Sequence, residues 1–129
     1  MPLVRITVAS GLPPQTRRAL GDAAHKVLVE VAKAPAEDQF QVVEEVPPEN
    51  LIFSPSYLGI PHRAPIVFVQ VFMNLGRTVE VKQALYGALA QALSQVGGFA
   101  VDDVIVNLVE VPRENWSFGG GRMSYPPQP

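Results

Sequence analysis

The chain has 129 residues, of which 47% are hydrophobic and 17% are charged, and its formal net charge is −2. A chain of this length and apolar content can form one domain with a hydrophobic core, and its charge gives no electrostatic case for binding to nucleic acid. Cysteine is absent and there are only two histidines, so disulfides and thiolate metal sites are excluded and a histidine metal site is not expected.

The first half of the chain predicts a strand, a helix and a second strand. Apolar and polar side chains alternate over residues 3–9, as in a half-buried strand. Residues 14–34 repeat apolar side chains at helical spacing; Pro14 suits a first helical position and Pro35 ends the helix. Residues 39–46 are expected to form the next strand.

The second half repeats this order after a loop that is expected to contain a short strand at residues 51–53. Residues 65–73 predict a strongly apolar strand. Apolar side chains at helical spacing follow between residues 81 and 96, and Gly97 with its neighbouring glycine ends that helix. Residues 104–111 predict the last strand, and the remaining tail is rich in aromatic and turn-forming residues.

The two halves resemble each other at one fixed offset of 65 positions. The sequence EDQFQVVEEVPPEN at 37–50 aligns with DDVIVNLVEVPREN at 102–115. The same offset aligns the strands and the helices of the two halves. The chain is therefore interpreted as a tandem duplication of a β-α-β unit, with repeats of about 2–50 and 65–115 in a single domain over residues 1–129, plus an aromatic and glycine-rich C-terminal tail.

This duplication predicts an α+β fold. Each unit should place two parallel strands on either side of a right-handed helical crossover. Two units joined at their strand edges form a four-stranded mixed sheet with two helices on one face. Strand 65–73 is apolar on both faces, so the face without helices needs a cover, and oligomerisation provides one.

Pro2 has two interpretations. Proline is tolerated at the first residue of a strand, because it has no N–H to give to the sheet. However, the equivalent position of the second unit is Val67, so this strand does not need a proline there. If Met1 is removed, Pro2 instead carries a basic secondary amine at the chain terminus. Burial and a nearby cation lower the pKa of such an amine and favour a neutral base, whereas a nearby carboxylate keeps it cationic.

Several features together resemble the tautomerase superfamily, and within it the malonate semialdehyde decarboxylase-like branch. They are the Met-Pro start, DAAH at 22–25, Asp38, Arg77, DDVIV at 102–106 and WSFGGGR at 116–122. The resemblance covers nearly the whole chain. It implies a homotrimer of duplicated β-α-β protomers that uses an amino-terminal proline as catalyst and needs no cofactor.

The resemblance also implies the roles of individual residues. Pro2 would be the catalytic proline and Asp38 the carboxylate beside it, while Arg77 would act in the site by binding the substrate carboxylate. The aromatic side chains of the tail would form the hydrophobic wall of the pocket; these are Trp116, Phe118 and Tyr125. No metal ligands are expected.

These residues also have structural alternatives. Asp38 can be a solvated loop acid, and its repeat mate Asp103 shows that an acid at this position can be structural. Arg77 can be a surface arginine, although a cation near a helix start is slightly unfavourable unless it binds an anion. Trp116 and Phe118 can belong to the core or to a subunit interface.

The sequence therefore predicts a cofactor-independent enzyme that uses Pro2 for keto–enol proton transfer on a small 2-oxo or 3-oxo carboxylic acid. The alternative is a malonate semialdehyde decarboxylase or hydratase. Leu75 stands where the resemblance would place a second arginine, and this favours the tautomerase. An alternative of another class is a non-catalytic trimeric binding module. No nucleic-acid or membrane partner is expected, and the expected location is the cytoplasm.

Overall fold

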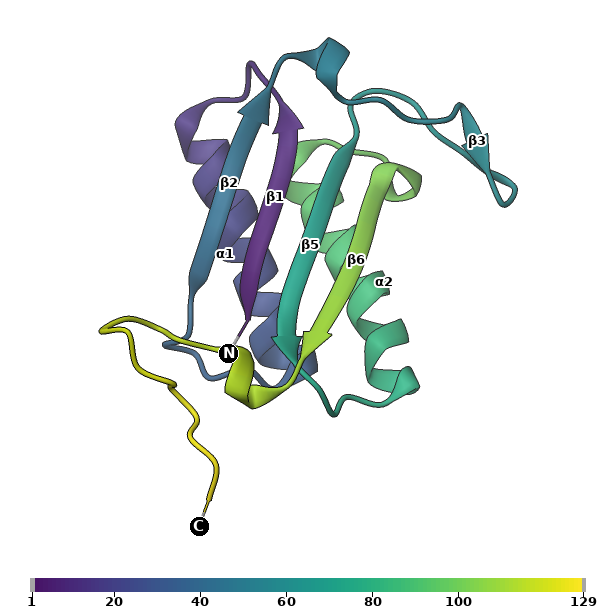
Figure 1. Cartoon of the computed structure of the whole chain (residues 1–129). Coiled ribbons are helices and arrows are strands. Elements are labelled where there is room, and N and C mark those ends of the chain that lie inside the picture. Colours follow the sequence, from purple (N-terminus) through teal and green to yellow (C-terminus); the bar gives the residue numbers. More distant parts are fainter. Residues whose placement is uncertain (1, 129) are drawn as a thin grey trace.

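The computed structural model describes residues 2–128 and contains the two predicted β-α-β units (Figure 1). The first unit consists of β1 (Leu3–Ala9), α1 (Pro14–Ala32) and β2 (Phe40–Val46). The second consists of β5 (Val67–Asn74), α2 (Val79–Gly97) and β6 (Val104–Val111). Short 3₁₀ turns follow or precede the strands: η1 (Pro48–Asn50), η2 (Val101–Asp103) and η3 (Arg113–Asn115).

The main sheet has four strands in the order β2-β1-β5-β6. Each unit contributes a parallel pair, and the two units join through the antiparallel pair of β1 and β5. Both helices lie on one face of this sheet (Figure 1). The predicted α+β fold, a mixed sheet with two helices on one face, is confirmed.

The duplication extends to individual contacts at the offset of 65. The equivalent pairs are the amides of Ser10 and Leu75, which donate to the carbonyl oxygens of Val46 and Val111 at 2.9 and 3.1 Å, and the ion pairs Arg17–Glu45 and Lys82–Glu110. Each ion pair joins the second strand of a unit to the helix of the same unit. The repeated pattern in the sequence therefore preserves tertiary contacts as well as secondary structure.

The core lies between the sheet and the helices. It is formed by one face of the central strands and by the facing stripes of both helices. Its fully buried side chains include Val4, Ile6, Val8, Leu20, Leu28, Val69, Val71, Leu85, Leu89 and Leu93. The leucine stripe of α2 is therefore part of the core, as its helical spacing predicts.

The end of α2 depends on a glycine that makes a close contact. A Cβ atom at Gly97 would lie 2.8 Å from Cδ2 of Phe99 and 3.0 Å from Cδ2 of Leu20. Phe99 is only 3% exposed, so its ring cannot move into solvent. Gly97→Ala is therefore expected to overpack the core and to lower the free energy of unfolding by about 1–3 kcal/mol, partly offset by the higher helix propensity of alanine.

The matched control is Gly87→Ala. Gly87 lies within the same helix, and a Cβ atom there has no neighbour within 4 Å among the residues that the structure describes. We expect this substitution to raise the free energy of unfolding by up to about 1 kcal/mol. Urea unfolding of both variants measures the difference. Equal stability of the two would show that the Phe99 contact carries no cost.

The segment between η1 and β5 differs from the prediction. Residues 51–53 form no strand; a small antiparallel hairpin of β3 (Ser56–Tyr57) and β4 (Ile60–Pro61) follows them instead. The apolar pattern at 51–53 is too short to distinguish a strand from an apolar loop. Figure 1 shows this hairpin projecting away from the main sheet.

The sheet face opposite the helices remains open in the single chain. Phe68 and Phe72 of β5 lie half-buried on it, and Gln70 between them is exposed. The register places Gln70 beside Arg5 and Asn107, so an exposed polar row crosses a partly apolar face. The prediction that both faces of this strand are covered is therefore met only on the helix side within one chain.

Candidate functional site

The predicted site residues gather at one edge of the main sheet. Strands β1 and β2 begin at this edge, and β5 and β6 end there (Figure 1). The same edge holds the C-terminal end of α1 and the tail that follows β6. The antiparallel junction of the two units thus brings the start of the first unit to the strand ends of the second.

Pro2 directly precedes β1 and is buried. Leu3 pairs with Phe40 of β2 and with Phe72 of β5. Continuing this register by one residue puts Pro2 level with Gln39 and Met73, next to the residue that ends β5. Met1, whose removal would free the Pro2 amine, lies outside the described residues.

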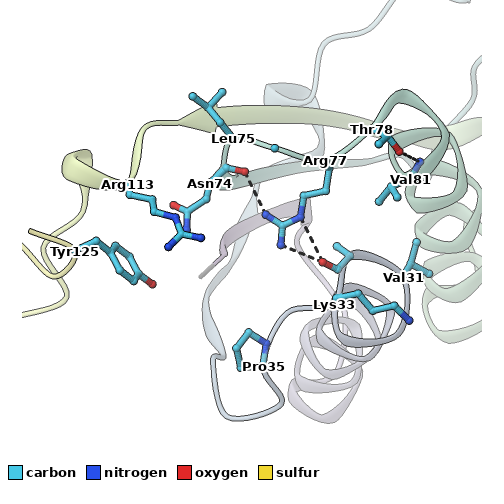
Figure 2. Close-up of a pocket in the computed structure, with 12 residues that line it drawn as sticks. Val31, Lys33, Pro35, Asn74, Leu75, Arg77, Thr78, Val81, Arg113 and Tyr125 are labelled. Atoms are coloured by element: carbon cyan, nitrogen blue, oxygen red, sulfur yellow. Dashed lines mark hydrogen bonds between the residues drawn. The ribbon is translucent and has the colours of Figure 1, made fainter. Parts of the chain in front are cut away.

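A cavity of about 610 Å³ opens at this edge, between the end of α1, the turn from β5 to α2, and the residues after β6 (Figure 2). Three cationic side chains line it: Lys33, Arg77 and Arg113. Within residues 2–128, no aspartate or glutamate belongs to its lining. The cavity is therefore suited to an anion.

Arg77 is held in place by main-chain oxygens. Its Nε and Nη2 donate to the carbonyl oxygen of Ala32 at 3.3 and 3.0 Å, and its Nη1 donates to the carbonyl oxygen of Asn74 at 3.2 Å. Ala32 ends α1, where a cation is favourable to the helix dipole. Because a guanidinium has five N–H groups, two remain for a ligand in the cavity.

Glu110 joins β6 to the helix that follows Arg77. Lys82 Nζ donates to Glu110 Oε1 at 2.5 Å. The hydrogen bond from Lys82 is the main reason that the pKa of Glu110 lies below its ordinary value. The ion pair thus ties β6 to the first turn of α2, the helix that follows Arg77.

Glu110→Gln is expected to remove a pH-dependent part of the stability. Since the pKa of Glu110 is lowered in the folded chain, its contribution is present above the ordinary glutamate pKa of about 4.3 and is lost as the pH falls through the lowered value. The side chain is partly exposed, so the expected loss at neutral pH is at most about 1 kcal/mol.

Urea unfolding at neutral pH and near pH 3 measures this effect. The free energy of unfolding of the wild type should exceed that of Glu110→Gln by less at the lower pH than at neutral pH. Glu49→Gln is the control, because Glu49 is exposed and the described part of the chain offers it no ion pair. A difference that stays constant with pH would show that Glu110 acts through packing rather than charge.

The aromatic residues of the tail form one cluster. The rings of Trp116 and Phe118 stack at 4.9 Å between centroids, and Phe118 meets Tyr125 edge-on at 6.3 Å. Phe40, the first residue of β2, joins them at 5.3 Å from Phe118. Of the cluster, Tyr125 also lines the cavity. Between Phe118 and Tyr125 the chain turns through three glycines with positive φ, Gly119 to Gly121, and no helix begins there.

Asn74 links the aromatic cluster to the cavity. Its side chain is buried, and its Oδ1 accepts a hydrogen bond from Nε1 of Trp116 at 2.7 Å. Its main-chain oxygen accepts from Arg77. One residue thus orients both the tryptophan and the arginine. The signal in the sequence is a polar residue directly after an apolar run, Val71 to Met73, at the end of the strand.

Asp38 lies in the segment between α1 and β2 and is half-buried. Its amide donates to the carbonyl oxygen of Pro35 at 3.0 Å. Its carboxylate has no hydrogen bond or ion pair with the other described residues, which leaves it available to a neighbour or to water. It does not belong to the lining of the cationic cavity.

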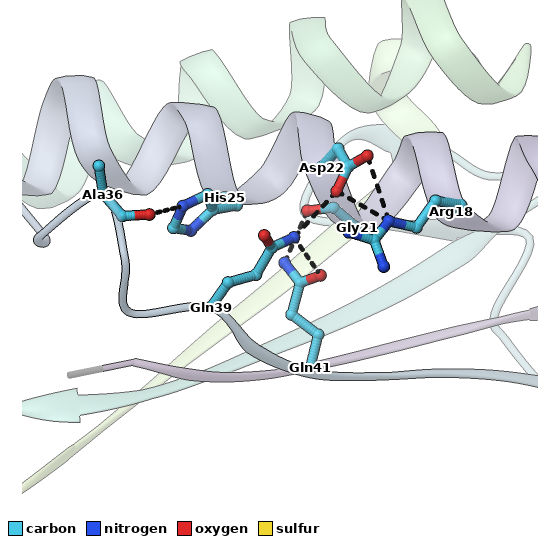
Figure 3. Close-up of polar contacts among 7 residues, drawn as sticks. All are labelled: Arg18, Gly21, Asp22, His25, Ala36, Gln39 and Gln41. Carbon is cyan, nitrogen blue, oxygen red and sulfur yellow. Dashed lines mark hydrogen bonds and ion pairs between the residues drawn. The ribbon is translucent and has the colours of Figure 1, made fainter.

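Polar contacts to α1 hold this segment in place (Figure 3). Nε2 of His25 donates to the carbonyl oxygen of Ala36 at 2.7 Å, and Nε2 of Gln39 donates to Asp22 at 2.9 Å. The hydrogen bond from Gln39 is the main cause that lowers the pKa of Asp22. These contacts anchor both sides of Asp38 to the helix.

The structure thus places the predicted residues at one edge but in different positions. Arg77 and Tyr125 line the cavity, whereas Pro2, Asp38, Trp116 and Phe118 lie around the same edge outside its lining. Further residues lie at this edge that were not predicted from the sequence, namely Phe40, Asn74 and Arg113. Phe40 and Arg113 are ordinary residues for a strand start and a turn, so no local signal identifies them.

Within residues 2–128, no three histidine, aspartate or glutamate side chains form a group that could hold a metal ion. No helix in the same part of the chain is long and apolar enough to cross a membrane.

Comparison with known proteins gives consistent matches. A family model described as "Tautomerase enzyme" matches residues 38–119, and a second with the same description matches residues 2–60. The chain is 34% identical, over 97% of its own length and 96% of the relative's, to "Probable tautomerase YrdN" of Bacillus subtilis (strain 168).

Solved structures show the same likeness. A crystal structure of FG41 malonate semialdehyde decarboxylase, inhibited by 3-bromopropiolate, has a TM-score of 0.87 and 36% identity, covering 95% of this chain and 93% of that one. A fused 4-OT wild-type symmetric trimer has a TM-score of 0.78 and 29% identity, covering 93% of this chain and 94% of that one.

Proposed function

The chain belongs to the tautomerase family of enzymes, and from this premise we propose that it transfers a proton between the enol and keto forms of a small 2-oxo or 3-oxo carboxylic acid. Pro2, freed by removal of Met1, is the acid–base group. The reaction needs no cofactor. The family match also favours an enzyme over a non-catalytic binding module.

One observation carries the proposal: the buried start of β1 lies beside the strand end that leads to a cationic cavity. Pro2 is level with Met73 in the sheet register, Asn74 follows, and Arg77 lines the cavity three residues later. A base at the chain terminus and a guanidinium that can hold a carboxylate therefore belong to the same edge of the sheet. This separation of roles suits a substrate with a carboxylate next to an enol.

In the proposed step the neutral Pro2 nitrogen accepts the proton of the enol hydroxyl group. The enol C=C bond becomes a single bond as the C=O bond forms, and the carbon accepts the proton back from the Pro2 ammonium, so no proton is gained or lost overall. Arg77 holds the substrate carboxylate, and Asp38 controls the charge on Pro2 or orients a water. The rings of Trp116, Phe118 and Tyr125 exclude water from the reacting carbons.

We also propose that the working form is a homotrimer. The open face of the sheet carries half-buried phenylalanines with no cover in the single chain. A similar solved structure, the fused 4-OT, is a trimer. A native mass of three chains would support this assembly, and a monomer at working concentration would contradict it.

Decarboxylation or hydration of malonate semialdehyde is the second candidate, favoured by the likeness to malonate semialdehyde decarboxylase. A cationic Pro2 would polarise the substrate carbonyl in that reaction. Leu75, which lines the cavity and is 59% exposed, presents no charge to a substrate there. The assay must therefore follow both reactions.

The test is to mix the purified protein with enol phenylpyruvate and follow the ultraviolet change, and to incubate it separately with malonate semialdehyde. A rate above background with the enol supports the tautomerase. Turnover of malonate semialdehyde alone supports the second candidate, and no rate with either contradicts both. Intact mass decides the premise about Pro2: a species one methionine lighter is expected, and full-length mass alone would contradict the mechanism.

A further inference from the structure

A second guanidinium at the cationic cavity has no partner in the proposed mechanism. Arg113, in the turn η3 after β6, lines the cavity together with Arg77. The described residues give Arg113 no ion pair, and none of them adds a carboxylate to the cavity lining. Its charge is therefore not balanced at this site.

The two arginines approach the cavity from different elements. Figure 2 shows Arg113 on one side and Arg77 on the other, with the side chain of Asn74 between them. Two like charges that face one cavity repel each other, and an anion between them removes that repulsion. Because Arg77 keeps two N–H groups free, a carboxylate could accept from both guanidinium groups at once.

Tyr125 supports the position of Arg113. The guanidinium carbon of Arg113 lies 5.8 Å from the centroid of the Tyr125 ring, within the range of a cation–π contact. Tyr125 is itself held by its edge-on contact with Phe118. The tail therefore has a charge-positioning role in addition to the hydrophobic wall that it forms.

Lys33 does not share this geometry. Its Nζ donates to the carbonyl oxygen of Glu30, and Figure 2 shows its side chain directed away from Arg77 and Arg113. Of the cations that line the cavity, Arg77 and Arg113 therefore form the facing pair.

We propose that Arg113 is a substrate-binding residue that holds the substrate carboxylate together with Arg77, and that Tyr125 positions it. This inference rests on the proposed function and adds a specificity-determining residue to it. It makes the site selective for a carboxylate over an uncharged group of the same shape. It also provides a second cationic contact although Leu75 is uncharged.

Binding can be measured without turnover, because Trp116 is the only tryptophan in the chain and bonds to Asn74 at the cavity. The probes are 3-phenylpropanoate and its uncharged analogue 3-phenylpropanamide. Tryptophan fluorescence and calorimetry of the full chain give the Kd of each probe. Wild type should bind the carboxylate more tightly than the amide.

Arg113→Ala should raise the Kd of 3-phenylpropanoate by about 10-fold or more and should change the Kd of 3-phenylpropanamide little. The reason is that only the carboxylate accepts charge-assisted hydrogen bonds. In the assay, KM should rise more than kcat falls. Arg113→Lys should lie between, because it keeps the charge and loses the fork. Tyr125→Leu alone should also raise the Kd of 3-phenylpropanoate. In a protein that already carries Arg113→Ala, it should raise this Kd no further.

Two controls separate a specific contact from a general loss of charge. Lys33→Met removes a cation from the same cavity lining. Arg113→Ala must therefore raise the Kd of 3-phenylpropanoate more than Lys33→Met does. Arg18→Ala removes an arginine on the exposed side of α1, paired with Asp22 outside the cavity lining, and should leave both probes unchanged.

The inference is wrong if Arg113→Ala leaves the Kd of the carboxylate unchanged. It is also wrong if this substitution raises the Kd of the carboxylate and the Kd of the amide by the same factor. In either case the proposed function still stands if the wild type is active and the Arg77→Gln variant is not. A wild type that binds neither probe and turns over neither substrate would overturn both proposals.

Discussion

Replacement of Pro2 by alanine is expected to lower kcat/KM for the enol-to-keto conversion of phenylpyruvate by about 10²- to 10⁴-fold, which is the contribution of a positioned general acid–base group. Alanine at the chain terminus would offer a primary amine that is less basic and rotates freely. Pro2 is buried beside β2 and β5, so its ring nitrogen is fixed in direction. Ultraviolet assays of wild type and variant under the same conditions measure the ratio.

The comparison is valid only if both proteins lose Met1 and fold equally. Intact mass must show the processed species in each, and urea unfolding must give similar midpoints, because Pro2 precedes the first residue of β1 and donates no hydrogen bond to the sheet. Equal rates for two processed, folded proteins would show that the Pro2 amine takes no part in catalysis.

Loss of the Arg77 guanidinium is the second large effect that we expect. Arg77→Gln should lower kcat/KM by about 10- to 100-fold, which corresponds to the 1.5–3 kcal/mol of hydrogen bonds between charged groups. Arg77→Lys should recover part of this loss, since it keeps the charge without the bidentate fork. Steady-state kinetics over a range of substrate concentrations separate KM from kcat.

Arg77 also has a structural role that the experiment must separate from binding. It donates two hydrogen bonds to the carbonyl oxygen of Ala32, the last residue of α1, so Arg77→Gln is expected to cost about 1–2 kcal/mol of stability. Activity is therefore compared well below the unfolding transition of each variant. A variant that is folded and has unchanged kinetics would assign Arg77 to structure alone.

The strands and helices were predictable because their signals are local. The strand shows in the alternation over residues 3–9, and the second helix shows in leucines that recur every four residues. Both patterns can be read within a short stretch of the chain, and both elements are present. The ends were less predictable: the first helix ends at Ala32, two residues before the prediction, where Lys33 adopts a left-handed conformation with φ of 61°. Lysine carries no signal for that conformation.

The composition of the site was only partly predictable. Pro2, Asp38 and Arg77 were predicted from their chain positions and from a family resemblance, and of these three only Arg77 lines the cavity. Asn74 and Arg113 were not predicted, although the first bonds to Trp116 and the second lines the cavity beside Arg77. Asn74 had a weak signal, a polar residue at the end of an apolar run, whereas the position of Arg113 depends on which elements meet, and the residues that flank it do not encode this.

The amino-acid sequence by itself determined the β-α-β duplication, because a repeat at an offset of 65 and the periodicity of apolar residues can be read along the chain. Only the tertiary structure decided that β1 and β5 are the strands that join the two units, and in which register they pair. That pairing brings Pro2 level with the end of β5, while the parallel pairing of β5 with β6 places Arg77 and Arg113 after neighbouring strand ends at the same cavity. The physical reason is that cation placement depends on long-range strand pairing, whereas periodicity reports only which face of each element is buried.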